Sequence, residues 1–281
     1  GRVAGREREF AARAWGRGVE AGEIARALRR SRASAHRIVL EGRASRLGAL
    51  DLSCATSGTF SRRDASEVLL APRDVREGLA GPAREEWGAW VGRARVGRAP
   101  DEERERAMGA ALCYLRWRAA RALERAGERR PTAGWVDRIE TDLRWAWWLA
   151  GALAETQAFV AVRNLEERLG GPAEGLSGER ARLAHAALRG ALVRAALAFD
   201  PFKGGRGARL AGVSTVFVTR VMPWLSERGA LVVGRAGAAR ARGVMVEDVS
   251  WRVVGWSWRT AGPRAREPAA RHDGEARDVV R

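Results

Sequence analysis

The sequence predicts a mainly α-helical protein with an N-terminal helix-turn-helix, a central helical bundle and, as an option, a small β-hairpin near the C-terminus. Apolar residues recur at helical spacing over most of the 281 residues. No run of 18 apolar residues occurs, so we expect no membrane-spanning segment. The expected divisions are a helix-turn-helix (1–47), a linker (48–82), a helical domain (83–228), a hairpin or wing (229–259) and a disordered tail (260–281).

The positive charge of the chain is concentrated at its two ends. The formal net charge is +17. Residues 1–46 hold 12 basic and 5 acidic side chains (+7), residues 47–200 hold 24 and 22 (+2), and residues 201–281 hold 15 and 7 (+8). Two basic ends around a nearly neutral middle are expected when both ends contact a polyanion such as DNA. A general arginine bias is the other explanation, because Lys203 is the only lysine.

Residues 6–47 carry the pattern of a helix-turn-helix. We expect a short helix around residues 10–15, a second over 23–28 and a third over 33–46, with the polar turn Arg29-Arg30-Ser31-Arg32 between the last two. The start of the third helix would face base edges, and flanking arginines would contact phosphates. The expected base-reading residues are Arg32, Ala33, His36 and Arg37, and the expected phosphate contacts are Arg29, Arg30 and Arg43. A helical hairpin with a solvated basic face is the alternative.

Two long helical segments follow a loop-rich stretch. Serines and prolines in residues 48–82 predict mostly loop, with one short helix over 65–70. Asp101 is expected to cap a helix that runs to about residue 129, and a further helix is expected over 135–169. The tryptophans of the second helix recur at helical spacing, which favours core packing over base stacking.

The stretch Leu188 to Val221 joins an apolar helix to a cationic, glycine-rich loop and then to a second helix. Leu188, Leu192 and Phe199 lie on one helical stripe, which Asp200-Pro201 ends. Glycines in the loop that follows predict a flexible connection, and its basic residues predict contact with an anion.

The run Gly190-Ala191-Leu192-Val193-Arg194-Ala195, followed by Phe199-Asp200-Pro201, resembles the second conserved region of the sigma-70 class of bacterial RNA polymerase initiation factors. The run Cys113-Tyr114-Leu115-Arg116-Trp117-Arg118-Ala119 is similar to a helix in a divergent group of that class, which also carries an N-terminal helix-turn-helix. This resemblance covers residues 83–222 and implies a helical bundle that binds promoter DNA and RNA polymerase core. The polymerase contacts assigned on this basis are Arg189, Leu192 and Arg194, and the DNA contacts are Lys203, Arg206, Arg209 and Phe217. Arg220 is expected to face phosphate in a winged-helix arrangement, which the same residues also allow.

Residues 206–233 also fit a winged helix. The turn would be Gly212-Val213-Ser214, the recognition helix 215–227 and the first strand of the wing 229–233. This arrangement is typical of a transcriptional regulator that does not bind polymerase. A third alternative is a decayed sigma relative that acts as a helical protein-interaction module.

The sequence contains no recognisable catalytic motif. It lacks the phosphate-binding, zinc-hydrolase and nucleophile-elbow patterns, and its three histidines are scattered. Cys54 and Cys113 lie far apart without metal-ligand spacing and fit a reducing cytoplasm. We therefore predict a cytoplasmic, non-enzymatic DNA-binding protein without cofactor or metal, with DNA and RNA polymerase core as partners and no membrane attachment.

Overall fold

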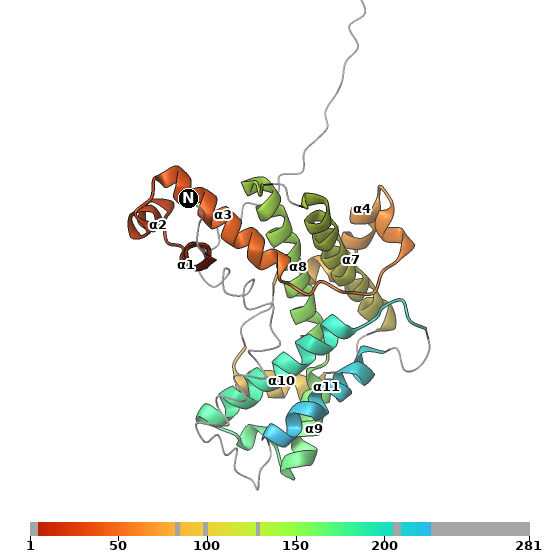
Figure 1. The fold of residues 1–281 in the computed structure, drawn as a ribbon. Helices are drawn as coiled ribbons and strands as arrows, with labels where there is room; N and C mark the ends of the chain where they lie inside the picture. Colours follow the sequence, from red (N-terminus) through yellow and green to blue (C-terminus); the bar gives the residue numbers. More distant parts are fainter. Residues whose placement is uncertain (1–4, 82–84, 98–100, 128–129, 205–208, 226–281) are drawn as a thin grey trace, which may run out of the picture. The chain divides into compact units, whose positions relative to one another are not determined.

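A computed structural model describes residues 5–81, 85–97, 101–127, 130–204 and 209–225, and it confirms the mainly α-helical fold (Figure 1). The chain divides into two compact units at the bond between Gly42 and Arg43. The predicted hairpin and tail lie outside the described residues. The helices are α1 (Gly5–Gly16), α2 (Ala21–Leu28), α3 (Arg32–Gly48), η1 (Gly58–Ser61), α4 (Ala65–Leu70), α5 (Arg73–Gly78), α6 (Trp87–Val96), α7 (Glu102–Ala126), α8 (Ala133–Thr156), α9 (Ala158–Leu169), η2 (Ala173–Gly175), α10 (Gly178–Ala198) and α11 (Leu210–Leu225).

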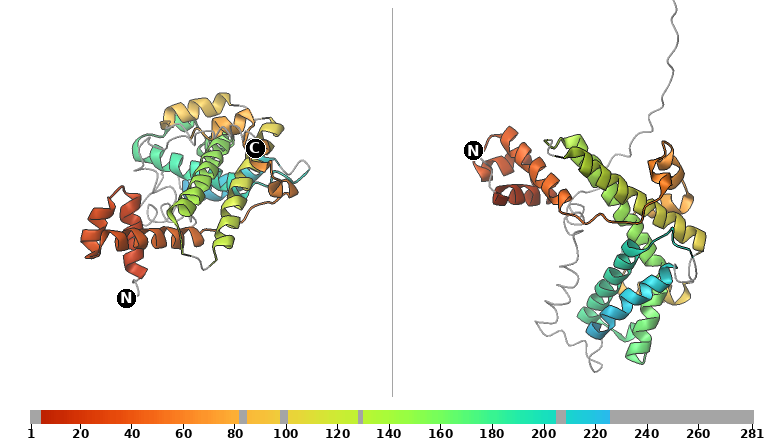
Figure 2. Two further views of the ribbon diagram at one scale, coloured as in Figure 1. Left: turned by 90° about the horizontal axis from the view of Figure 1, so that it is seen from above. Right: turned by 45° about the vertical axis from the view of Figure 1, so that its right-hand side comes forward.

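The N-terminal unit packs α1, α2 and the first part of α3 around a small apolar core (dark red to orange in Figure 2). Helices α1 and α3 approach closely at Gly42, where a Cβ atom would lie 2.3 Å from the carbonyl oxygen of Arg8. Only a residue without a side chain fits this crossing. The core residues are Ala11, Ala14, Ile24, Ala25, Ala35, Ile38 and Val39.

In the second unit, the long helices α7 and α8 pack along each other (Figure 1). The continuous helix expected over 135–169 is wrong, because α8 ends at Thr156 and α9 begins at Ala158. Gln157 between them is fully buried, and its side-chain amide donates a hydrogen bond to Glu105 of α7 at 3.1 Å. The break therefore brings a polar side chain into the helix interface, where it has a partner.

The end of α10 is held against α7. A Cβ atom at Gly109 of α7 would lie 2.8 Å from the ring of Phe199 and 3.1 Å from Pro201. Phe199 itself is only 4 % exposed. The Phe199-Asp200-Pro201 segment that ends the helix is thus packed onto α7, while α10 itself also packs against α8 and α11.

Residues 48–82 do not form a free linker. Helices η1, α4 and α5 lie in this stretch, and α4 and α5 pack against α7. Phe60 and Val75 are buried, although both are isolated apolar residues in a polar sequence. Only α4 was expected here, because single apolar residues in a polar stretch give no periodic pattern, although Phe60 packs against Cys113 and Tyr114 of α7.

Candidate nucleic-acid interface

The turn between α2 and α3 lies where the sequence predicts it and is closed by hydrogen bonds. Arg29 ends α2 in the left-handed conformation (φ 53°), and the N–H of Arg30 donates to the carbonyl of Ala25 at 3.0 Å. The Ser31 hydroxyl accepts a hydrogen bond from the N–H of Ser34 at 3.2 Å and so caps α3. These hydrogen bonds, all within the N-terminal unit, fix how α3 begins after the turn.

The start of α3 has one buried and one exposed face. Ala35, Ile38 and Val39 lie in the core of the N-terminal unit. The residues expected to read bases, Arg32, Ala33, His36 and Arg37, are all exposed on the other side of the helix, and Arg29 and Arg30 are exposed in the preceding turn. We call these six residues the α3 face. Their common exposure follows from helical periodicity, which separates them from the core positions.

Two arginines of the α3 face form long, exposed ion pairs. Arg30 lies 3.5 Å from Glu7, and Arg37 lies 3.7 Å from Glu41, with the two arginine side chains 45 % and 58 % exposed. Exposed ion pairs of this kind contribute about 0–1 kcal/mol to stability. A phosphate group could therefore replace either carboxylate at little energetic cost.

Trp15 contacts the α3 face, which the sequence did not indicate. Its ring meets the imidazole of His36 edge to face, with a centroid distance of 6.3 Å, and its side chain is 37 % exposed. The sequence placed Trp15 only in the first helix. The contact depends on how α1 crosses α3, so no local pattern could have revealed it.

Arg43 is not part of the α3 face. It donates hydrogen bonds to Glu140 at 2.7 Å and to Asp137 at 2.6 Å, and its side chain is 11 % exposed. Burial lowers the pKa of Arg43, but the two carboxylates outweigh it and hold that pKa above its ordinary value. The expected phosphate contact is wrong, because this guanidinium is already neutralised by residues about a hundred positions away in the sequence.

The predicted DNA contacts of the second unit differ in whether they are exposed or already paired with a carboxylate. Arg220 and Phe217 come together on α11, with the guanidinium 5.5 Å from the ring centroid, and Lys203 is exposed. Arg209 instead donates to Glu105 at 3.0 Å. That carboxylate is 1 % exposed and its hydrogen bond raises the pKa of Arg209. Arg206 lies outside the described residues.

The alternative of a second helix-turn-helix near Gly212 does not hold. Gly212-Val213-Ser214, the predicted turn, lies inside the uninterrupted helix α11. Leu210, Ser214, Val218 and Val221 are buried at helical spacing, and α11 packs against α9 and α10 along this stripe. Tertiary packing thus keeps the helix continuous through the glycine. The predicted wing lies outside the described residues.

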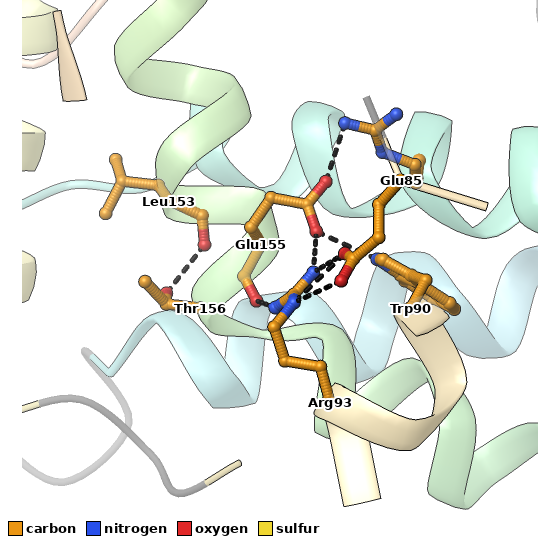
Figure 3. A network of polar contacts seen from close by, with 7 residues as sticks. Glu85, Trp90, Arg93, Leu153, Glu155 and Thr156 are labelled. Carbon is orange, nitrogen blue, oxygen red and sulfur yellow. Dashed lines mark hydrogen bonds and ion pairs between the residues drawn. The ribbon is translucent and has the colours of Figure 1, made fainter. Parts of the chain in front are cut away.

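The residues assigned to polymerase binding are mostly engaged inside the second unit. Arg189 of α10 lies 2.6 Å from Glu155 of α8, whose carboxylate also pairs with Arg93 of α6 at 2.6 Å. Figure 3 shows the guanidinium of Arg93 between the carboxylates of Glu85 and Glu155.

Leu192 is 1 % exposed in the core beneath α11, so the expected polymerase contact of Leu192 is wrong. The apolar stripe of α10 to which Leu192 belongs faces the core. Arg194 is half-buried on the same helix.

No family model, curated protein or solved structure matches this chain. Within the described ranges, no helix has the length and apolar character needed to cross a membrane. In the same ranges, no group of three or more histidine, cysteine or acidic side chains is arranged to hold a metal ion. Among the predicted sites, the α3 face is the one whose six residues are all exposed at the start of one helix and in the turn before it.

Proposed function

We propose that the protein binds double-stranded DNA through its N-terminal unit, with the start of α3 in the major groove. The observation that carries this proposal is the exposure of Arg32, His36 and Arg37 on one face of a capped helix, directly after an exposed basic turn. Arginine can donate two hydrogen bonds to a guanine edge or to a phosphate. The function proposed is binding without catalysis.

Charge supports the same assignment. Residues 1–46 hold 12 basic and 5 acidic side chains, and the ion pairs of Arg30 and Arg37 are long enough to be exchanged for phosphates. Each phosphate contact releases counterions, so log affinity should fall with log salt concentration with a slope of about −0.9 per contact. A salt titration therefore counts the contacts directly.

The test compares two double variants of the full chain by fluorescence anisotropy on random-sequence duplexes and on duplexes selected from them. Arg32→Gln with Arg37→Gln should lower affinity for selected DNA by about tenfold or more, since a good bidentate contact is worth about 1–3 kcal/mol. The control is Arg73→Gln with Arg163→Gln, which removes the same charge from exposed pairs on α5 and α9. An equal loss in both variants would show that charge alone, and not the α3 face, binds DNA.

The resemblance of residues 83–222 to the sigma-70 class supports a more specific role. We propose that the protein acts at transcription initiation, in the cytoplasm, with promoter DNA and RNA polymerase core as partners. The two segments that carry the resemblance lie together: Arg116 of α7 donates to the carbonyl of Leu197 in α10 at 2.8 Å, and Phe199 packs on Gly109. In the described part of this unit, the candidates for a promoter contact are Lys203 after α10 and Arg220 and Phe217 on α11.

Co-purification with bacterial RNA polymerase core tests this role separately from DNA binding. Retention of core polymerase by the full chain is the expected result. DNA binding by the α3 face without polymerase retention would favour a transcriptional regulator. Absence of both activities would favour a helical protein-interaction module whose charge reflects an arginine-rich composition.

A further inference from the structure

The two cysteines, 59 positions apart, lie next to each other in the second unit. The thiol of Cys54, in the extended segment after α3, donates to the carbonyl oxygen of Cys113 in α7 at 3.4 Å. Both are free thiols, and Cys113 is buried while Cys54 is partly exposed. Phe60 and Tyr114 pack around them. One cysteine of the pair is thus partly exposed and the other is buried.

A buried cation adjoins this pair. Arg116 is 5 % exposed and donates to the carbonyls of Leu197, at 2.8 Å, and of Ser53, the neighbour of Cys54. In the part of the chain that the structure describes, no carboxylate lies within ion-pair distance of Arg116, although its charge lowers the pKa of Asp51, and its Nε atom has no hydrogen-bond partner. A buried guanidinium held only by carbonyl groups favours an anion nearby.

The surroundings of the two thiols give them different pKa values. A hydrogen bond from the Cys113 side chain lowers the pKa of Cys54 to about 7, against the effect of burial and with help from the positive charge of Arg116. The same hydrogen bond, burial and the negative charge of Cys54 raise the pKa of Cys113, with a smaller contribution from Asp200 and against the positive charge of Arg116. Cys54 is thus the more acidic of the two thiols. A thiolate is the reactive form of cysteine.

We propose that Cys54 and Cys113 form a thiol-oxidation site that reacts with hydroperoxides. The Cys54 thiolate attacks the outer oxygen of the peroxide, the O–O bond breaks, and the leaving alkoxide takes a proton from solvent, which leaves Cys54 as a sulfenic acid. The sulfur of Cys113 then attacks that of Cys54. Hydroxide leaves and takes up the Cys113 proton as water, so the two thiols have lost two electrons and the peroxide has become an alcohol and water.

The disulfide would join residues 51–57 to α7. The nearby Phe60 packs against Tyr114 of α7, and its ring lies 5.6 Å from that of Phe202 after α10, so the bond would secure a segment that already packs against α7. A bond between residues 59 positions apart closes a long loop, which lowers the conformational entropy of the unfolded chain and so stabilises the folded one. The midpoint temperature of the second unit should rise by about 5–10 °C on oxidation.

The first experiment treats the full chain with hydrogen peroxide and follows intact mass and linked peptides. A loss of two hydrogens and a peptide linking Cys54 to Cys113 are expected. With Cys113→Ser, dimedone should trap a sulfenic acid at Cys54, whereas with Cys54→Ser the remaining thiol should stay reduced. Oxidation of Cys54 to sulfinic acid without a linked peptide, or first reaction at Cys113, would overturn the assignment.

The second experiment measures the pH dependence of iodoacetamide alkylation at Cys54. The rate should rise with a midpoint near pH 7, as its pKa requires. At pH 7 the rate should exceed that of an ordinary cysteine by roughly threefold, because the larger thiolate fraction is partly offset by the lower nucleophilicity of a weaker base. Arg116→Lys should keep the profile, and Arg116→Gln should move its midpoint to higher pH. A midpoint of Cys54 alkylation above pH 8 in the unaltered chain would contradict the proposal, and this result does not depend on whether the variants fold.

Discussion

The imidazole of His185 lies against the ring of Trp90, with 4.9 Å between the ring centroids, and its buried Nε2 atom has no hydrogen-bond partner among the residues that the structure describes. Trp87 contacts the same imidazole at 5.9 Å. Burial lowers the pKa of His185, and the charges of Arg189 and Arg93 add to this effect, although Glu155 and Glu85 oppose it. The folded chain therefore holds this histidine in its neutral form near pH 7.

His185 should make the second unit less stable in mild acid. Because its folded pKa is depressed, the unfolded chain binds the proton first, so stability is highest above the unfolded pKa of about 6.5 and falls as pH drops below it. His185→Phe keeps an aromatic ring and removes the titration. Calorimetric midpoints at pH 7.5 and 5.5 should differ less for this variant than for the unaltered chain. An identical difference in both proteins would rule out this histidine as the cause.

Gly42→Ala should disrupt the N-terminal unit. The added Cβ would meet the carbonyl oxygen of Arg8 at 2.3 Å and the Cβ of Ala12 at 2.9 Å, so α1 and α3 must move apart. A loss of about 3 kcal/mol is expected, at the upper end for overpacking, because backbone cannot yield as a side chain does. Hydrogen exchange over residues 5–42 should accelerate. Gly48→Ala, at the end of the same helix with open space around it, is the matched control and should leave exchange unchanged.

Arg29→Gly should distinguish the effect of this positive charge on DNA affinity from its effect on the stability of the N-terminal unit. Arg29 adopts a left-handed conformation that costs about 1–2 kcal/mol for a residue with a side chain, and glycine removes that cost. The N-terminal unit should therefore be as stable as before or more so. If DNA binding uses this turn, affinity should nevertheless fall, and the salt slope should become shallower by about 0.9. Unchanged affinity and slope would remove Arg29 from the proposed interface.

Arg118 should be essential for the stability of the folded chain, because it neutralises a buried carboxylate. Its guanidinium pairs with both oxygens of Asp142, which is 4 % exposed. Arg118→Met should cost about 3–5 kcal/mol, since it leaves that charge buried and unpaired. Adding Asp142→Leu to this variant should recover most of the loss, as both charged groups are then replaced by apolar ones. A double variant no more stable than the single one would show that the pair acts through something other than charge burial.

The Arg118→Met variant also carries a pH signature. Burial raises the pKa of Asp142 even with Arg118 present, although the paired guanidinium opposes this. A raised carboxyl pKa means that stability is greatest at low pH and declines as pH rises through it. The variant should therefore lose more stability at pH 8 than at pH 5, as measured by urea unfolding. A pH-independent loss would count against an ionised Asp142.

Helical periodicity and turn chemistry determined much of this protein from the sequence alone. They placed the turn at residues 29–32, the exposed face of α3 and the long helices α7 and α10. These features depend on neighbours within one or two turns, which a sequence pattern records directly. Local patterns were misleading where packing overrides them, as at Gly212 within α11 and at Gln157 between α8 and α9.

Only the tertiary structure decided which polar groups are already occupied and which distant residues meet. It paired Arg43 with Glu140, turned Arg209 toward the buried Glu105, and brought Cys54 to Cys113 across 59 positions. A charge or a thiol looks the same in the sequence whether its partner is water or a residue on another helix. Because ion pairing, burial and thiol reactivity all depend on that partner, they become determined only when the helices pack.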